Sequence, residues 1–287
     1  MAEVATSGTS SATSDQLLVV IDPVARRADG ESVRIARDVL RAGAARAKVC
    51  LPDGPEEFAR VLARRGSRRP VVVGDDRALV RAVELLHRQR ELAGCALSLV
   101  PVGGSVSLAR SLGVPSGAVA AARAVLDGAE RRMDLLVDDS DGVVLGALRI
   151  PPLGARPARE AAVGRPWLRT CRSLARTLVP TRPSRIVSAP EPGTARLRVE
   201  VDGETLVDLH QPVRTVSVVP CALGTARVEV RPASVDAEAP PLVVEGRTVT
   251  VSGAHFRYRA DALVSGPVRT RTWVVREEAW GLVLPAR

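Results

Sequence analysis

The segment at residues 100–115, VPVGGSVSLARSLGVP, decides the fold. It begins as the end of a buried apolar strand, turns at Gly103 and Gly104, and continues as a short helix. Glycine at such a turn lets backbone N–H groups approach a bound group closely, and the helix N-terminus favours an anion. The segment therefore predicts a strand–turn–helix unit shaped like a phosphate-binding turn, although Val106 and Ser107 carry no carboxylate or amide to hold a phosphate or its metal.

Short apolar runs alternate with amphipathic stretches from residue 17 up to this segment. The runs LLVVI, AKVCL, PVVVG and ALSLVPV stand at residues 17–21, 47–51, 70–74 and 96–102. Helical periodicity is found at residues 31–41, 55–64, 77–90 and 115–127. Strands that alternate with helices indicate a parallel sheet with right-handed crossovers. Ligands of such sheets bind beyond the carboxyl ends of the strands, which here are Asp22, residues 74–76 and residues 103–104.

The composition and the hydrophobic pattern of the sequence divide the chain into three parts. Residues 1–16 are small and polar and predict a disordered tail, and residues 17–130 predict the α/β domain with its parallel sheet. From residue 131 to residue 287 the runs are short, alternating and separated by turns, which is typical of a β-sandwich domain. We expect one helix within it, at residues 166–178, and room for the final strands to return to the first domain. The acidic turn at residues 138–141, DDSD, could bind a cation, but we favour its interpretation as a solvated hairpin turn.

The amino-acid composition limits the classes of molecule that the protein is expected to bind. The formal net charge is +9, and all of the basic residues except Lys48 are arginines, so the surface should attract anions such as phospholipid headgroups or nucleotides. Aromatic residues make up only 2% of the chain, too few to stack on bases, which argues against a nucleic-acid binder. The four cysteines form no metal-spaced pair and predict a reducing, cytoplasmic compartment. No apolar run approaches the length of a transmembrane helix.

The order of these motifs resembles the catalytic family of diacylglycerol kinases, lipid kinases that include sphingosine kinases and share their fold with NAD kinases. That family carries a run close to LPxGTGNDFARxLGIP, with which residues 100–115 align without a gap. The residues shared with that run are Pro101, Gly103, Ala109, Arg110, Leu112, Gly113 and Pro115.

Three further segments have the layout of that family. Residues 73–77 read VGDDR where the family has Gly-Gly-Asp-Gly-Thr at a strand end, and Asp22-Pro23 stands where the family has Asn-Pro. Residues 259–285 are similar to the family's closing strands, with Asp261 at the acidic position. The resemblance therefore spans the chain roughly from residue 17 to residue 285.

The resemblance implies a diacylglycerol kinase-like and NAD kinase-like fold and an ATP-dependent lipid kinase that phosphorylates the hydroxyl of a diacylglycerol or sphingoid-like lipid. In the family ATP lies between the two domains, Mg²⁺ bridges its phosphates, and the late acidic residue takes the hydroxyl proton, so the resemblance gives Asp261 the catalytic role. The positions that it assigns to the nucleotide are Asp22, Gly74, Asp75, Arg77, Gly103, Gly104 and Ser105. The resemblance then implies that the partner is a lipid at the anionic inner face of the membrane. Assembly of the chain into a homo-oligomer is a further possibility that the sequence does not decide.

The chain departs from the family at several of these positions. Asp76 and Arg77 replace the second glycine and the threonine of the upstream motif, and a carboxylate beside a triphosphate repels it unless a metal lies between them. The alternative role for Asp76 is to cap the helix that follows it, and Asp261 could equally be a turn aspartate. Losing one preorganised charge-stabilising group costs about a hundredfold in rate. Two functions therefore stay open: a lipid kinase, and an inactive pseudokinase of the same fold that binds a nucleotide, a lipid or another protein.

Overall fold

A computed structural model of the chain describes residues 16–151, 194–233 and 240–286. The predicted helix at residues 166–178 lies outside the described residues, as does the predicted N-terminal tail up to residue 15. Gln16, which we placed in that tail, is the first residue of a strand.

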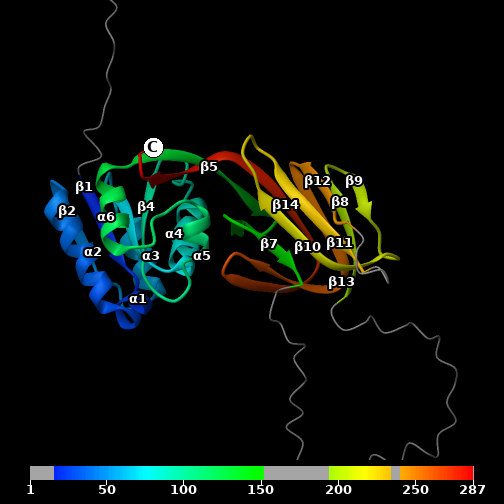
Figure 1. Cartoon of the computed structure of the whole chain (residues 1–287), viewed down its shortest axis with the longest axis horizontal. Helices are drawn as coiled ribbons and strands as arrows, with labels where there is room; N and C mark the ends of the chain where they lie inside the picture. Colours follow the sequence, from blue (N-terminus) through cyan, green and yellow to red (C-terminus); the bar gives the residue numbers. More distant parts are fainter. Residues whose placement is uncertain (1–15, 152–193, 234–239, 287) are drawn as a thin grey trace, which may run out of the picture.

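The helical half of the molecule (Figure 1) contains four strands that pair in parallel, in the order β2-β1-β3-β4. These strands are β1 (Gln16–Ile21), β2 (Arg46–Cys50), β3 (Arg69–Gly74) and β4 (Ala96–Pro101). The helices are α1 (Pro23–Ala28), α2 (Gly30–Gly43), α3 (Pro55–Ala63), α4 (Asp76–Arg88), α5 (Ser107–Ser111) and α6 (Ala118–Asp127). Five consecutive buried residues in each of β1, β3 and β4 are what a strand covered on both faces requires.

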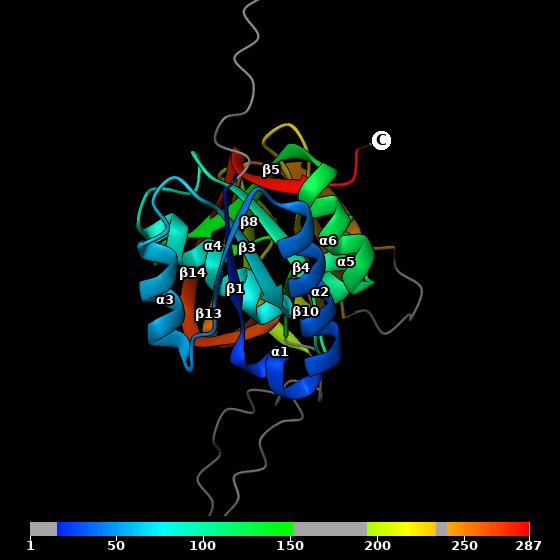
Figure 2. The same ribbon diagram turned by 90° about the vertical axis from the view of Figure 1, so that its left-hand side faces the viewer.

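Helices cover both faces of these strands (Figure 2). Leu17, Val19 and Ile21 pack in one core cluster with residues of α2 and α6, while Leu18 and Val20 pack in another with residues of α3 and α4. Successive side chains of a strand point to opposite faces, so alternate residues of one apolar run pack in the two different clusters. The carboxyl ends of β1, β3 and β4 are thereby brought to one edge.

The other half of the molecule is built from strands that pair mainly antiparallel. They are β6 (Val143–Val144), β7 (Leu148–Ile150), β8 (Ala195–Val201), β9 (Glu204–Val207), β10 (Pro212–Pro220), β11 (Ala226–Pro232), β12 (Leu242–Gly246) and β13 (Thr248–Ala260). Inward side chains of β7, β8, β9, β10, β11 and β13 form one core cluster, which contains Tyr258 and also Trp273 from the last strand of the chain.

The pairing in this half differs from that of an open sandwich. β8 pairs with both β13 and β10, and β7 also pairs with both of them, so these four strands close into a ring. An irregularity in β10 between Val213 and Thr215 lets its first residues leave β7 and pair with β8. Bulges of this kind bend a strand and allow a sheet to turn a corner.

Two long strands connect the halves. β5 (Ala129–Asp138) runs antiparallel beside β14 (Leu263–Leu284), and in Figure 1 this pair crosses from the helices to the β region. The end of β14 pairs in parallel with β4, which joins both halves in one continuous sheet. The expected boundary at residue 130 therefore falls inside β5. Within the described residues, no helix is long and apolar enough to cross a membrane.

Candidate functional site

A cavity of about 1300 Å³ lies between the helical half and the β region. The helical half contributes the start of α4, the turn after β4 and helix α5, and the β region contributes β7, the end of β10, the turn after β13 and the middle of β14. This volume exceeds the roughly 300–1,000 Å³ of most small-molecule sites. The described residues therefore form a large pocket at the edge where the strand ends converge.

Most of the residues selected from the sequence meet at this pocket. Asp75, Arg77, Gly104, Ser105 and Asp261 line it. The remaining three, Asp22, Gly74 and Gly103, do not line it, but they lie directly behind its wall.

Close packing at the strand ends holds these three residues in place. A Cβ added to Gly74 would lie 3.1 Å from the Cβ of Asp22, and one added to Gly103 would lie 3.4 Å from the Cβ of Asp75. Gly103 has a φ of 122°, a conformation that L side chains rarely adopt. The Asp22 carboxylate caps α1 and forms an ion pair with Arg81 at 3.3 Å. Asp22 is therefore engaged within the protein.

The two adjacent aspartates after β3 have different roles. Asp75 is the N-cap of α4, and its Oδ1 accepts hydrogen bonds from the backbone N–H groups of Arg77 and Ala78, both at 3.1 Å. The expectation that Asp76 caps the helix that follows it is therefore wrong. Asp76 is the first residue of α4, and the hydrogen bonds to its carboxylate come from residues 105–109 and not from α4.

Asp76 instead holds the start of α5, and only 1% of its surface is exposed. Its Oδ2 accepts from Ser105 Oγ at 3.1 Å, Ser107 Oγ at 3.2 Å and Leu108 N at 3.0 Å. Its Oδ1 accepts from Ala109 N at 3.0 Å. Four donors compensate a buried carboxylate for the water that it has lost. The N–H groups at the start of α5 thus already bind an anion, which belongs to the protein itself.

This arrangement does not fit a nucleoside triphosphate with its magnesium. The first N–H groups of α5 are the donors that a phosphate would use at a turn of this shape, and Asp76 occupies them. A phosphate placed there would also meet the negative charge of that carboxylate. In the part of the chain that the structure describes, no group of three His, Cys, Asp or Glu residues could hold a metal ion.

Asp261, selected as the catalytic base, lies in the turn between β13 and β14. Its carboxylate accepts hydrogen bonds from the backbone N–H groups of Leu145 at 2.7 Å, Gly146 at 2.8 Å and Ala147 at 2.9 Å. Burial raises the pKa of Asp261 above its ordinary value, while these three N–H groups oppose the rise. Both oxygens are engaged by the backbone, so the carboxylate ties the β13–β14 turn to the loop before β7.

Three arginines that the sequence analysis did not select also line the pocket: Arg132, Arg149 and Arg259. Arg149 in β7 and Arg259 in β13 are Cα partners across antiparallel strands. The run LRI at residues 148–150 indicates that Arg149 points away from the core, because its two apolar neighbours are buried. Nothing in the sequence indicates which strand lies next to it.

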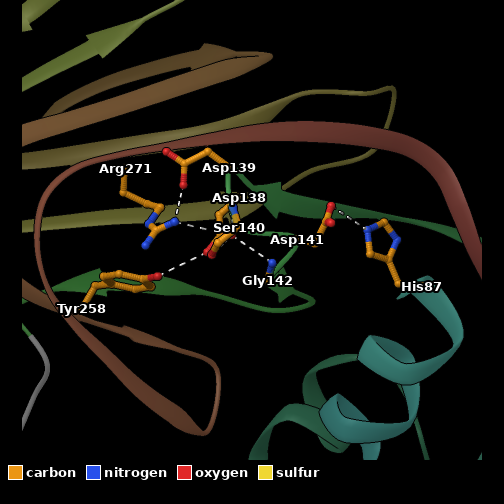
Figure 3. A network of polar contacts seen from close by, with 8 residues as sticks. All are labelled: His87, Asp138, Asp139, Ser140, Asp141, Gly142, Tyr258 and Arg271. Atoms are coloured by element: carbon orange, nitrogen blue, oxygen red, sulfur yellow. Dashed lines mark hydrogen bonds and ion pairs between the residues drawn. The ribbon is translucent and has the colours of Figure 1, made fainter. Parts of the chain in front are cut away.

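The acidic turn at residues 138–141 forms a polar network with Arg271 and Tyr258 (Figure 3). Asp138 Oδ1 accepts from Ser140 N and Oγ and from Gly142 N, and Asp138 Oδ2 accepts from Tyr258 Oη at 3.2 Å. Arg271 forms ion pairs with Asp138 and Asp139. Only 9% of Asp138 is exposed, whereas residues 139–141 are exposed, so the turn is solvated as expected except at Asp138, which is held by internal contacts.

Comparison with known proteins identifies the fold. No protein-family model and no curated sequence matches the chain. Three solved structures of a diacylglycerol kinase from Bacillus anthracis strain Sterne, two of them described as putative, superpose with a TM-score of 0.66 at 13–14% identity. The alignments cover 94% of this chain and 96–97% of those chains. The chain therefore has the diacylglycerol kinase-like fold.

Proposed function

We propose that this protein is a ligand-binding pseudokinase of the diacylglycerol kinase-like fold: it binds an amphiphilic lipid in the cavity between its halves and transfers no phosphate. The observation that carries the proposal is the buried Asp76 carboxylate at the start of α5. Phosphoryl transfer depends almost entirely on positioning the phosphates and neutralising their charge. A fixed negative charge at the turn that should hold the phosphates opposes both.

The position of Asp261 supports the same conclusion. A general base must reach the hydroxyl proton of its substrate with a free oxygen lone pair. Three of the roughly four acceptor sites of the Asp261 carboxylate already accept backbone hydrogen bonds, and these bonds hold a loop of the pocket wall in place. The acidic position is therefore better suited to building the pocket than to catalysis.

The lining of the cavity suits a hydrocarbon chain. Leu108, Leu112, Met133, Leu145 and Leu223 contribute apolar side chains to it. Sites for small molecules are typically apolar, with a few polar groups that orient the ligand. With a net charge of +9, the protein is attracted to anionic membrane surfaces, and we propose that it takes up its ligand at the cytoplasmic face of such a membrane.

The test is a pair of measurements on the purified full chain. In the first, the protein is incubated with γ-labelled ATP, Mg²⁺ and vesicles containing diacylglycerol, sphingosine or monoacylglycerol, and we expect no labelled lipid. In the second, thermal unfolding is followed with each lipid and with ATP and Mg²⁺, and we expect stabilisation by a lipid and none by the nucleotide. Labelled lipid that disappears in Asp261→Asn would overturn the proposal in favour of a kinase.

A further inference from the structure

We propose that the free edge of β12 is an interface through which two copies of this chain pair in antiparallel about a two-fold axis. The proposal concerns the assembly of the protein and does not depend on what the cavity binds. It rests on the place of β12 in the sheet, on the exposed apolar side chains of this strand, and on the way in which these side chains match a second copy of themselves.

β12 is an edge strand of the β region and lies away from the helices (Figure 1). Residues 242–246 pair with β11 in a continuous antiparallel register without a bulge. Among the described residues, no strand pairs with the other side of β12. The backbone N–H and C=O groups on that side are therefore available to a further strand.

The exposed side chains of this edge are mainly apolar. Leu242, Val243 and Val244 are 39%, 48% and 36% exposed. Three consecutive exposed apolar residues are unusual, because exposed positions of a strand normally alternate with buried ones. Natural edge strands are commonly protected by a lysine, a proline or a bulge. β12 has no lysine, no proline and no bulge within it, so its edge is suited to pairing.

The neighbouring strand shows to which face each of these side chains belongs. Val244 is the Cα partner of Val228 of β11, which is buried in the core of the β region. Leu242 is likewise the partner of the buried Val230. Leu242 and Val244 therefore extend the core face of the sheet beyond its covered part, and Val243 lies on the opposite face. A further strand beside β12 would cover apolar surface on both faces.

The apolar sequence of this edge is self-complementary, which favours a second copy of the chain as the partner. In an antiparallel pair centred on Val243, this residue faces its own copy, and Leu242 of each chain faces Val244 of the other. Residues directly opposite each other lie on the same face of a sheet, so all three apolar side chains meet apolar partners. A pair centred on Val244 would instead place Val243 opposite Glu245 of the other copy.

The charges around β12 allow this pairing. Glu245 is the only charged residue of the strand, and it forms an ion pair with Arg227 of β11 at 3.8 Å. In the pair centred on Val243, Glu245 lies opposite Pro241 of the second copy, so no two like charges are opposed. Two-fold pairing uses the free edge of both chains at once, so the assembly closes at two copies.

The small size of the interface determines how tightly the dimer forms. β12 has 5 residues, far fewer than the roughly 20–30 residues per side of a standard interface. We therefore expect a dimer in equilibrium with the monomer, with a Kd of about 1–100 µM. Well below this concentration the chain is a monomer, so binding of lipids and vesicles can be measured there without the dimer. β12 does not line the cavity, so the cavity is accessible in both states.

The experiment is analytical ultracentrifugation of the full chain between about 1 and 300 µM, combined with hydrogen exchange. The unchanged protein should shift from monomer to dimer over this range, and the amides of β12 should exchange more slowly in the dimer. Val243→Lys should raise the Kd at least about tenfold, because the pair centred on this residue would oppose two lysines. Val243→Glu should do the same, and an equimolar mixture of the two variants should dimerise again, because opposite charges then face each other.

Leu209→Lys is the matched control, because Leu209 is an exposed leucine outside β12 that does not line the cavity. This variant gains the same charge and should dimerise like the unchanged protein, and circular dichroism should show all variants folded. A chain that stays monomeric at every concentration would overturn the proposal; slow exchange of the β12 amides in that monomer would show that another segment of the same chain covers the edge. A dimer that Val243→Lys leaves unchanged would place the interface elsewhere, and failure of the mixture to dimerise would reject the two-fold pair centred on Val243.

Discussion

Asp75 and Asp76 are neighbours in the chain and hold two different helices. The carboxylate of Asp75 uses one oxygen to cap its own helix, whereas that of Asp76 uses both oxygens to hold the start of α5. This difference determines how much replacement of each carboxylate by an amide changes the stability of the protein. Asparagine keeps one acceptor oxygen and replaces the other by a donor group.

The first prediction follows from that difference. Asp76→Asn should lower the free energy of unfolding by about 2–3 kcal/mol, since an amide NH₂ would face donors in a buried site. Asp75→Asn should cost less than about 1 kcal/mol, because asparagine is as good an N-cap as aspartate. Urea denaturation of both variants measures the two free energies of unfolding and tests both expectations. Equal losses would show that the Asp76 carboxylate is not engaged as described.

The second prediction concerns pH and Asp138. Burial opposes ionisation of Asp138, but hydrogen bonds from Ser140 and Gly142 and the charge of Arg271 outweigh it and hold its pKa below the ordinary value of 3.8. The folded protein thus binds this proton less readily than the unfolded chain does. The stabilisation is present above pH 3.8 and is lost as the pH falls through the lower pKa of the folded state.

Urea unfolding of the unchanged protein and of Asp138→Asn between pH 7 and pH 2 tests this. The unchanged protein should be the more stable at pH 7, and the difference should shrink below about pH 4 as Asp138 takes up its proton. A difference in stability between the two proteins that stays constant down to pH 2 would contradict this prediction.

At the scale of elements, the β10–β11 turn presents an unusual residue. Leu223 lines the cavity, is 80% exposed and has a φ of 67°. A left-handed conformation costs a leucine about 1–3 kcal/mol, whereas asparagine tolerates it. We therefore expect this exposed apolar side chain to contact a membrane surface.

The third prediction uses this turn. Leu223→Asn should raise the free energy of unfolding by about 1 kcal/mol and weaken binding to phosphatidylglycerol-containing vesicles by about tenfold or more, because the buried area of one leucine is lost. Sedimentation with vesicles measures the second effect. The control is Leu242→Asn in β12, an exposed leucine that does not line the cavity, which should leave vesicle binding unchanged. Unaltered sedimentation of Leu223→Asn would reject this role.

At the scale of the whole molecule, β14 pairs with strands of both halves. Gly128, which joins α6 to β5, lies so close to the end of β14 that a Cβ there would be 2.4 Å from the carbonyl oxygen of Leu284. We therefore expect the halves to unfold together. Far-ultraviolet circular dichroism follows the described helices, which lie in one half, and near-ultraviolet circular dichroism follows Trp273 in the core of the β region together with Trp280 in the core of the helical half, so the two signals jointly report on both halves.

The fourth prediction is a single thermal transition, with the same midpoint in far-ultraviolet and near-ultraviolet circular dichroism. Gly128→Ala should lower both midpoints equally, because its Cβ cannot fit without moving β14. Two separate midpoints, or a shift in one signal alone, would show that the halves unfold independently.

Several elements were predictable from local pattern. The apolar runs at residues 17–21, 70–74 and 96–102 fall on β1, β3 and β4, and the turn at Gly103 and Gly104 leads into α5 as expected. The helix starts were less certain, since either of two adjacent aspartates can serve as the cap of α4. The closure of β7, β8, β10 and β13 into a ring left no local signal, because it depends on pairs between distant strands.

The sequence by itself determined most of the strands and helices, their order, and the edge at which the strand ends collect, because burial on one or both faces is encoded in the spacing of apolar residues. It did not indicate the short helix α1, which has too few residues for a helical period to be recognised. Only the tertiary structure decided what the charged residues do. Asp76 meets the start of α5 from 32 positions away, and Arg149 meets Arg259 only through the register of β7 and β13. Hydrogen bonds and ion pairs between distant segments depend on how those segments dock, and a local pattern does not carry that information.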